Sequence, residues 1–196
     1  TNLLEANRLD SQNTDIANSL AKLRVVASVL PSEKDEGEMA SQVRQAVQEY
    51  MDGNKKMTML KLKNVVYQQK DTDKYTKLAK AIASTYGEDF VAPRKDSMSP
   101  VESMNWEALG LLQAEKYADA IDKCDEVLQV EPNNINALMR KGSAYYFSKT
   151  YEGKLKARET WTKALNLKPE DKVLKYYLDK LNRELSEKEG GGALAP

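Results

Sequence analysis

The feature that most constrains the fold of this chain is a segment that occurs twice in its second half. Residues 107–134 and residues 141–171 align with each other. Each has the periodicity of paired amphipathic helices closed by a proline, Pro132 in the first copy and Pro169 in the second. A single helix pair leaves one apolar face uncovered, so neighbouring pairs must stack to bury it. The repeat therefore predicts an all-α solenoid.

Small residues stand at the positions where the two helices of each pair are expected to cross. Ala108 and Ala120 hold these positions in the first copy, and Gly142 and Ala157 hold them in the second. Two packed helices approach closely only where a small side chain faces a large one. We expect Trp161 to be that large side chain and to fill the space between the repeats.

Together these residues resemble the tetratricopeptide repeat (TPR) family. The matching positions are Ala108, Tyr117, Ala120, Cys124, Val127, Leu128 and Pro132 in the first copy, and Gly142, Tyr145, Ala157, Trp161, Ala164, Leu165 and Pro169 in the second. The resemblance implies a TPR-like α-solenoid over residues 104–187, made of two repeats and a C-terminal capping helix. The residues of this helix that we expect to face inward are Leu174, Tyr177, Leu178 and Leu181.

The second copy departs from the family in length. The interval from Pro132 to Pro169 is 37 residues, whereas the family repeats every ~34 residues. We expect the three extra residues to lengthen the turn around residues 148–154.

The N-terminal region, residues 1–88, is also predicted to be helical. The apolar stripe of its first expected helix consists of Leu9, Ile16, Leu20, Leu23, Ala27 and Leu30. Residues 46–66 fit the repeat pattern weakly, so this region either continues the superhelix or forms a separate module. Residues 89–103 contain two prolines and are predicted to form a linker. Residues 188–196 are predicted to be a disordered tail.

The composition excludes several kinds of function. The chain has no histidine and one cysteine, Cys124, which removes Ser-His, Cys-His and His-metal sites. We therefore predict no enzyme, no metal and no cofactor, and a buried Cys124. The basic and acidic residues, 30 of each, leave no net charge, which disfavours nucleic-acid binding. No stretch approaches the ~20 apolar residues of a transmembrane helix.

The compartment stays open. The first residue is Thr1, so the start of the natural chain is not visible. A single free thiol fits the cytoplasm, and a cysteine-poor chain fits a bacterial envelope.

The resemblance implies a function in protein–protein interaction. The inner helices of TPR modules line a concave groove that holds a peptide segment or a helix of a partner. The residues that match groove-lining positions are Asn105, Leu109, Leu112, Gln113, Asn136, Met139, Ser143, Tyr146 and Phe147, with Tyr176 and Lys180 closing the groove. The alternative for Tyr146 and Phe147 is packing against the last helix.

One well-known use of this groove is not expected. The family's carboxylate clamp for chaperone C-termini needs Lys and Asn on the first inner helix, Asn on the second, and Lys and Arg on the third. The residues at those places are Asn105, Leu109, Arg140, Val173 and Tyr177. We expect a non-enzymatic interaction module or scaffold subunit, either as a homo-oligomer or within a larger complex. The alternatives are a regulatory or assembly domain of an enzyme complex and an RNA-binding helical repeat.

Overall fold

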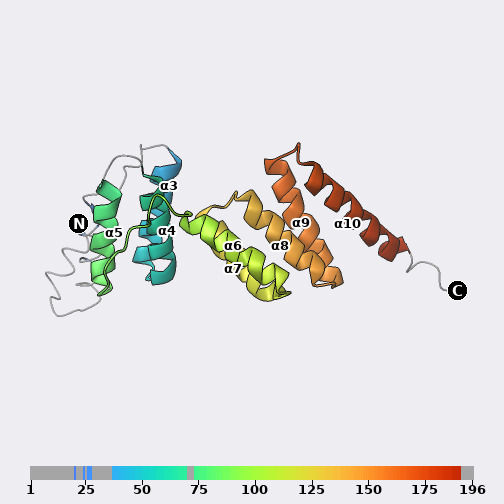
Figure 1. The fold of residues 1–196 in the computed structure, drawn as a ribbon, viewed down its shortest axis with the longest axis horizontal. Coiled ribbons are helices and arrows are strands. Elements are labelled where there is room, and N and C mark those ends of the chain that lie inside the picture. The colour runs from blue at the N-terminus through green and yellow to red at the C-terminus, as the bar shows by residue number, and fades with distance from the viewer. Residues whose placement is uncertain (1–19, 21–23, 25, 28–36, 70–72, 191–196) are drawn as a thin grey trace. The chain divides into compact units, whose positions relative to one another are not determined.

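The computed structural model describes residues 20, 24, 26, 27, 37–69 and 73–190, and the regular secondary structure of these residues is α-helical throughout. The predicted all-α fold class is therefore confirmed. The chain divides into two compact units, residues 1–100 and residues 101–196 (Figure 1). Within the described part of the chain, no helix has the length and apolar character needed to cross a bilayer.

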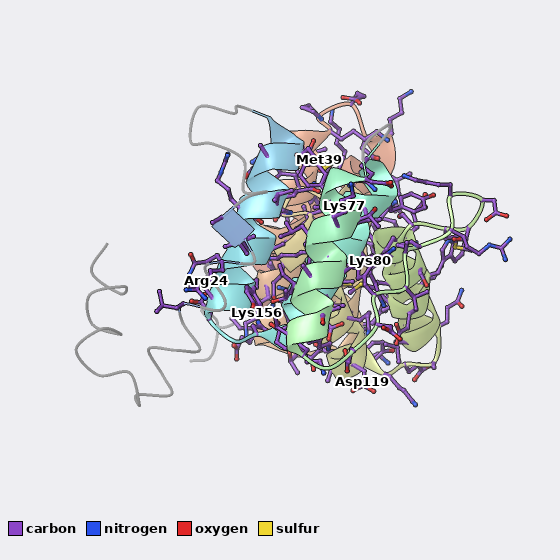
Figure 2. The ribbon with its side chains drawn as sticks, turned by 90° about the vertical axis from the view of Figure 1, so that its left-hand side faces the viewer. Arg24, Met39, Lys77, Lys80, Asp119 and Lys156 are labelled. Atoms are coloured by element: carbon purple, nitrogen blue, oxygen red, sulfur yellow. The ribbon has the colours of Figure 1, made fainter. Side chains whose placement is uncertain are left out.

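The first unit is built around the helices α3 (Glu38–Met51), α4 (Lys55–Gln68) and α5 (Lys74–Thr85). Helix α4 contacts both α3 and α5. The core of the unit consists of Val26, Val43, Ala46, Val47, Tyr50, Leu62, Val65, Val66, Leu78, Ala79, Ile82, Ala83 and Phe90. Lys77 and Lys80 project from the exposed side of α5 (Figure 2). Helix α5 is therefore amphipathic, with an apolar side in the core and a basic side in solvent.

Most of the first predicted helix lies outside the described residues. Leu20 is buried as predicted, but Ala27 is exposed and its neighbour Val26 is part of the core. The prediction for Ala27 is therefore wrong. Successive residues of a helix point about 100° apart, so a helix that buries Val26 turns Ala27 outward.

The segment that follows α5 makes specific contacts with the first unit. Phe90 is buried in the core. The ammonium group of Lys95 donates to the carbonyl oxygens of Val66, Tyr67 and Gln69 at the end of α4. These carbonyls have no partner within the helix, and the helix dipole favours a positive charge there. The first part of the predicted linker is thus attached to the first unit. The last four residues of that stretch, 100–103, are instead the start of a helix, Pro100–Gln113, so the predicted linker extends too far.

The second unit contains the helices α6 (Pro100–Gln113), α7 (Tyr117–Val130), α8 (Ile135–Phe147), α9 (Tyr151–Leu167) and α10 (Lys172–Gly190). Helix α8 contacts both α7 and α9, and α10 contacts α9. An ion pair of 3.2 Å between Lys123 and Glu107 joins α7 to α6. The helices α6 to α9 therefore form two stacked pairs, and α10 covers the second pair.

The same kind of cap begins the helix that follows each closing proline. The Asn134 side chain accepts a hydrogen bond of 3.0 Å from the backbone N–H of Ala137 in α8. The Asp171 side chain accepts bonds of 3.0 Å from the N–H groups of Val173 and Leu174 in α10. Such caps satisfy N–H groups that have no partner within the helix. The proline ends one helix and the capping residue starts the next.

The turn inside each helix pair has the same geometry in both copies. Three residues join α6 to α7 and three join α8 to α9. The middle residue, Glu115 or Lys149, is left-handed, with φ of 58° or 59°. The prediction that the extra residues lengthen this turn is therefore wrong. They lengthen α9 instead, which has 17 residues where α7 has 14.

A glycine allows the added turn of α9 to pack against the end of α8. Gly153 is buried in the first turn of α9. A Cβ atom there would lie 2.6 Å from the backbone carbonyl oxygen of Tyr145. Any larger residue would therefore push the start of α9 away from α8.

The residues predicted at the helix crossings are buried. All three alanines are fully inaccessible, and Trp161 is almost so. The indole ring of Trp161 occupies the space that a Cβ atom on Gly142 would need. Its N–H group also donates to the carbonyl oxygen of Met139 over 3.0 Å. Trp161 therefore packs directly against the backbone of α8, as its predicted role requires.

The buried side of the capping helix α10 differs in two residues from the prediction, since it includes Leu185 and excludes Tyr177. The helix also continues to Gly190, so the first three residues of the predicted disordered tail are helical. Its buried side consists of Leu174, Leu178, Leu181 and Leu185. Tyr177, predicted to face inward, is 42% exposed. The four leucines repeat at steps of four and three, which centres the buried stripe on them. Tyr177 falls at the margin of that stripe, where its ring contacts Trp161 at 5.8 Å between centroids.

We predict that Gly142→Ala lowers the free energy of unfolding by ~1–3 kcal/mol, as overpacking of a core does. The new methyl group would have to displace the Trp161 ring. Urea denaturation of the full chain, followed by circular dichroism, measures the change. Gly110→Ala is the matched control, because no atom lies within 4 Å of a Cβ at this exposed position of α6. Alanine there should stabilise the helix by ~0.5–1 kcal/mol, and equal effects of the two substitutions would contradict the packing described.

We also predict that Trp161→Ala costs ~3–5 kcal/mol, because the ring is removed from a packed core. The control is the second tryptophan, Trp106, which is 58% exposed on α6. Trp106→Ala should change the stability by less than ~0.5 kcal/mol. Thermal unfolding of the full chain compares the two variants. If Trp161→Ala changes the melting temperature as little as Trp106→Ala does, Trp161 does not pack in the core as described.

Candidate partner-binding face

The residues predicted to line the groove lie on α6, α8 and α10 of the second unit. Those on α6 are Asn105, Leu109, Leu112 and Gln113, those on α8 are Asn136, Met139, Ser143, Tyr146 and Phe147, and those on α10 are Tyr176 and Lys180. Hydrogen bonds connect the three helices, from Arg140 on α8 to Asn105 and from Tyr146 to Glu184 on α10. These residues, together with Arg140, are called the candidate face below.

Exposure varies across the candidate face. Gln113, Asn136, Phe147, Tyr176 and Lys180 are exposed, whereas Leu109, Leu112, Met139, Ser143 and Tyr146 are half-buried. Met139 and Tyr146 pack against the core around Trp161. Phe147 stacks on Tyr117 of α7 at 6.4 Å and is 45% exposed. Phe147 and Tyr176 are therefore the aromatic rings of the face that a ligand can contact most readily.

Asn105 is an internal link of the unit. It is 5% exposed. Its amide nitrogen donates to the Asn134 oxygen over 3.2 Å, and its oxygen accepts from the Arg140 guanidinium over 2.9 Å. Asn134 in turn donates to the Glu131 carboxylate over 2.8 Å and caps α8. Asn105 thus connects α6 to the start of α8 and fixes the position of Arg140.

A continuous series of ring contacts runs through four helices. In order, the rings are Tyr117, Phe147, Tyr146, Trp161, Tyr177 and Tyr176, with successive centroids 5.4–6.4 Å apart. Such separations fall in the range where aromatic pairs attract each other beyond the effect of burial. The series links a buried residue, Trp161, to exposed rings at α8 and α10. These exposed rings are therefore held on a rigid base.

A charged cluster joins the ends of α8, α9 and α10. The Glu184 carboxylate accepts a bond of 2.7 Å from the Tyr146 hydroxyl and forms an ion pair of 2.7 Å with Lys154. These contacts, from Lys154 first, hold the pKa of Glu184 below its usual value. Burial and the bond to Glu184 raise the pKa of Tyr146. The ammonium group of Lys180 lies 5.9 Å from the centre of the Tyr146 ring. The negative charge of Glu184 is therefore already compensated within the protein.

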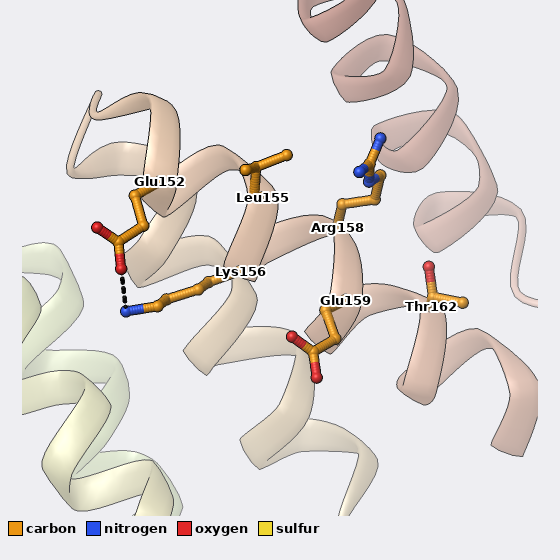
Figure 3. Close-up of a pocket in the computed structure, with 6 residues that line it drawn as sticks. All are labelled: Glu152, Leu155, Lys156, Arg158, Glu159 and Thr162. Carbon is orange, nitrogen blue, oxygen red and sulfur yellow. Dashed lines mark ion pairs between the residues drawn. The ribbon is translucent and has the colours of Figure 1, made fainter.

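A surface hollow of about 570 Å³ lies on the exposed side of α9 (Figure 3). Its lining residues are Glu152, Leu155, Lys156, Arg158, Glu159 and Thr162, all from this helix. Glu152 and Lys156 form an ion pair of 2.7 Å. None of these residues belongs to the predicted site. Charged residues at helical spacing are typical of a solvated helix side, so the sequence offered no signal for this hollow.

The described residues contain no group of His, Cys, Asp or Glu side chains that could hold a metal ion. Cys124 is fully buried in α7, as predicted. Burial raises the pKa of its thiol to about 11. The side chain is therefore a neutral core residue at neutral pH.

We predict that Cys124 does not react with iodoacetamide in the native chain at about pH 8, because the thiolate is the reacting species. The raised pKa and the burial of the thiol act in the same direction. Mass spectrometry should detect labelling only after unfolding in urea. The Cys124→Ser variant, which has no thiol, gives the background level of labelling. Native labelling as fast as in urea would show that this thiol is accessible.

Two residues contribute to the candidate face in ways that the sequence analysis did not predict. Tyr117 supports Phe147 from α7, and its own position in the repeat pattern gave no sign of this contact. Arg140 entered the sequence argument only as the residue that stands where the carboxylate clamp needs an asparagine. Its contact with Asn105 bridges 35 positions of the chain, so periodicity alone could not reveal it.

No protein-family model matches the chain. It is 28% identical over 83 residues, 42% of its length, to sperm-associated antigen 1 of Rattus norvegicus. Over 73 residues, 37% of its length, it is 37% identical to DnaJ homolog subfamily C member 3 of Bos taurus and 36% identical to the Homo sapiens protein of that name. The chain spans only 9% of the first relative and 14% of the other two. These relatives contain TPR repeats.

Proposed function

We propose that the chain is a non-enzymatic TPR-type interaction module, and that its candidate face binds a peptide segment or a helix of a partner protein. The observation that carries the proposal is the row of half-buried and exposed apolar side chains on helices that Trp161 and Asn105 hold in place. Rigid aromatic rings lose little conformational freedom when they are covered. Interfaces are enriched in aromatic residues of this kind.

The polar residues of the face fit the same function. Gln113 and Asn136 are exposed amide side chains beside the apolar row. Amides donate and accept hydrogen bonds, so they suit the backbone of a bound peptide. The pattern of apolar anchors with polar neighbours is typical of binding surfaces. The relatives named above support protein interaction in general, and the use of this face is our own proposal.

We predict that Leu109→Glu combined with Phe147→Glu abolishes partner binding and leaves the helical content unchanged. Leu109 is half-buried and Phe147 is exposed, so two carboxylates can reach solvent there. Tyr146→Glu is less suitable, because the new carboxylate would face Glu184. Crosslinking pulldown from the native source, with mass spectrometry, identifies the partner, and binding of the purified partner is then measured by calorimetry.

The matched control is Thr162→Glu on the exposed side of α9. It adds one of the two negative charges of the double variant, away from the candidate face, and should leave the affinity unchanged. Loss of binding in this control, with retention in the double variant, would place the interface on α9. Equal affinities in all variants would place it outside both surfaces.

A further inference from the structure

Arg140 carries a positive charge on the candidate face that no carboxylate of the described residues compensates. It is half-buried on α8. One nitrogen, Nη1, donates to the Asn105 oxygen over 2.9 Å, and no ion pair with Arg140 forms within the described part of the chain. A guanidinium group has five donors, and burial of an unpaired charge is unfavourable. Burial accordingly lowers the pKa of Arg140.

The partly buried lysines of the same unit are paired. Lys154 contacts Glu184 at 2.7 Å, Lys141 contacts Asp125 at 2.5 Å, and Lys123 contacts Glu107 at 3.2 Å. Arg140 differs from them in having a neutral amide as its partner. Among the described residues, Arg140 is therefore the half-buried cation of the candidate face that stays available for an anion from outside, whereas Lys180 is exposed and lies over the Tyr146 ring.

The protein also fixes the direction of this cation. Asn105 holds Nη1 of Arg140 and is itself held by Asn134. Asn134 in turn contacts Glu131. An arginine fixed on one side keeps the rest of its planar donor fork ready for a carboxylate. Asn105 thus acts as a positioning residue.

Phe147 provides an apolar contact at a defined separation from Arg140. The two residues are seven positions apart on α8, which places them on one side of the helix, about 10.5 Å apart along its axis. Tyr117 and Tyr146 support the Phe147 ring at 6.4 Å and 5.4 Å. Residues three apart in a polyproline II segment project to the same side, about 9.3 Å apart. The two separations match closely enough for side chains to adjust.

We propose that the candidate face recognises a peptide segment with an Asp or Glu side chain at Arg140 and an apolar side chain, three positions away, at Phe147. The inference rests on the proposed function and names the chemistry of the partner. A side-chain carboxylate is favoured over a chain end, because exposed or half-buried residues of the face continue on both sides of Arg140, with Asn136 before it and Ser143 after it. A bound segment can therefore extend in both directions.

The probe is a set of four short fluorescein-labelled peptides in a Ser/Gly background, the first three with amidated C-termini. One peptide carries Glu and Leu three positions apart, and its partner carries Gln in place of Glu. A third has the two residues adjacent, and a fourth replaces the Glu by a free C-terminal carboxylate. Fluorescence anisotropy with the full chain measures each affinity.

The Glu peptide should bind at least about tenfold more tightly than the Gln peptide, as expected for a charge-assisted hydrogen bond. Arg140→Gln should remove this difference. Lys141→Gln removes the same charge one residue away, at a lysine that Asp125 already neutralises, and should keep the difference. Phe147→Ala should weaken the Glu and Gln peptides by the same factor.

The remaining outcomes separate this inference from the proposed function. Equal binding of the Glu and Gln peptides, with loss in Phe147→Ala, overturns the role of Arg140 and leaves the proposed face in place. Tightest binding of the free-carboxylate peptide, or of the peptide with adjacent residues, overturns the stated side chain or spacing. Binding that neither Arg140→Gln nor Phe147→Ala reduces, or no binding to the native chain, counts against both proposals.

Discussion

The contact between Trp161 and the backbone at Gly142 determines how the second unit is built. Because Gly142 has no Cβ, the indole ring of α9 can lie directly on α8, with its N–H bonded to the Met139 carbonyl oxygen. The same ring forms part of the core against which α10 packs its leucines. One side chain therefore joins three successive helices. The aromatic residues at the surface are positioned by this contact, since Tyr146 and Tyr177 both pack on the same indole.

The charges of the second unit separate into two kinds. Glu184 is compensated by Lys154 and by the Tyr146 hydroxyl, so this cluster fastens the ends of three helices to one another. Within the described residues, Arg140 is held by the amide oxygen of Asn105 and by no carboxylate. Compensated charges add rigidity, and an uncompensated one attracts a ligand of opposite charge. The Tyr146 hydroxyl that contacts Glu184 and the Arg140 guanidinium both belong to α8, so this helix takes part in the fastening contacts and also carries the residue of the proposed recognition.

The sequence predicted those features of the fold that depend on local patterns. Helical periodicity, the closing prolines and the small residues at crossings are readable within one repeat, and they led to the confirmed all-α class and to the buried position of Trp161. Ala27 and Tyr177 were misplaced because a helix position at the edge of an apolar stripe can turn either way. The interval of 37 residues fits a longer turn or a longer helix equally well. The structure decides for the helix, in which Gly153 is buried against the end of α8.

Less of the candidate site than of the fold could be predicted from local sequence patterns. The periodicity placed the predicted residues on α6, α8 and α10, but it could not distinguish an open side chain from one used internally. Asn105 is the clearest example, because its partners Asn134 and Arg140 are 29 and 35 positions away in the chain. Whether the face binds a partner stays a prediction, since hydrogen bonds and exposure describe a surface and not its ligand.

The added turn of α9 shows how such a repeat can change length without losing register. Three residues make nearly one turn of an α-helix, about 4.5 Å of axis, and they precede Ala157 and Trp161 in α9. The residues that meet α8 and α10 therefore keep their phase, while the left-handed residue of the turn, Lys149, matches Glu115 of the first copy. Insertions of about one helical turn at this end extend the helix outward along its axis. In evolution or in engineering, this is the position where the unit can lengthen and gain new surface without repacking its core.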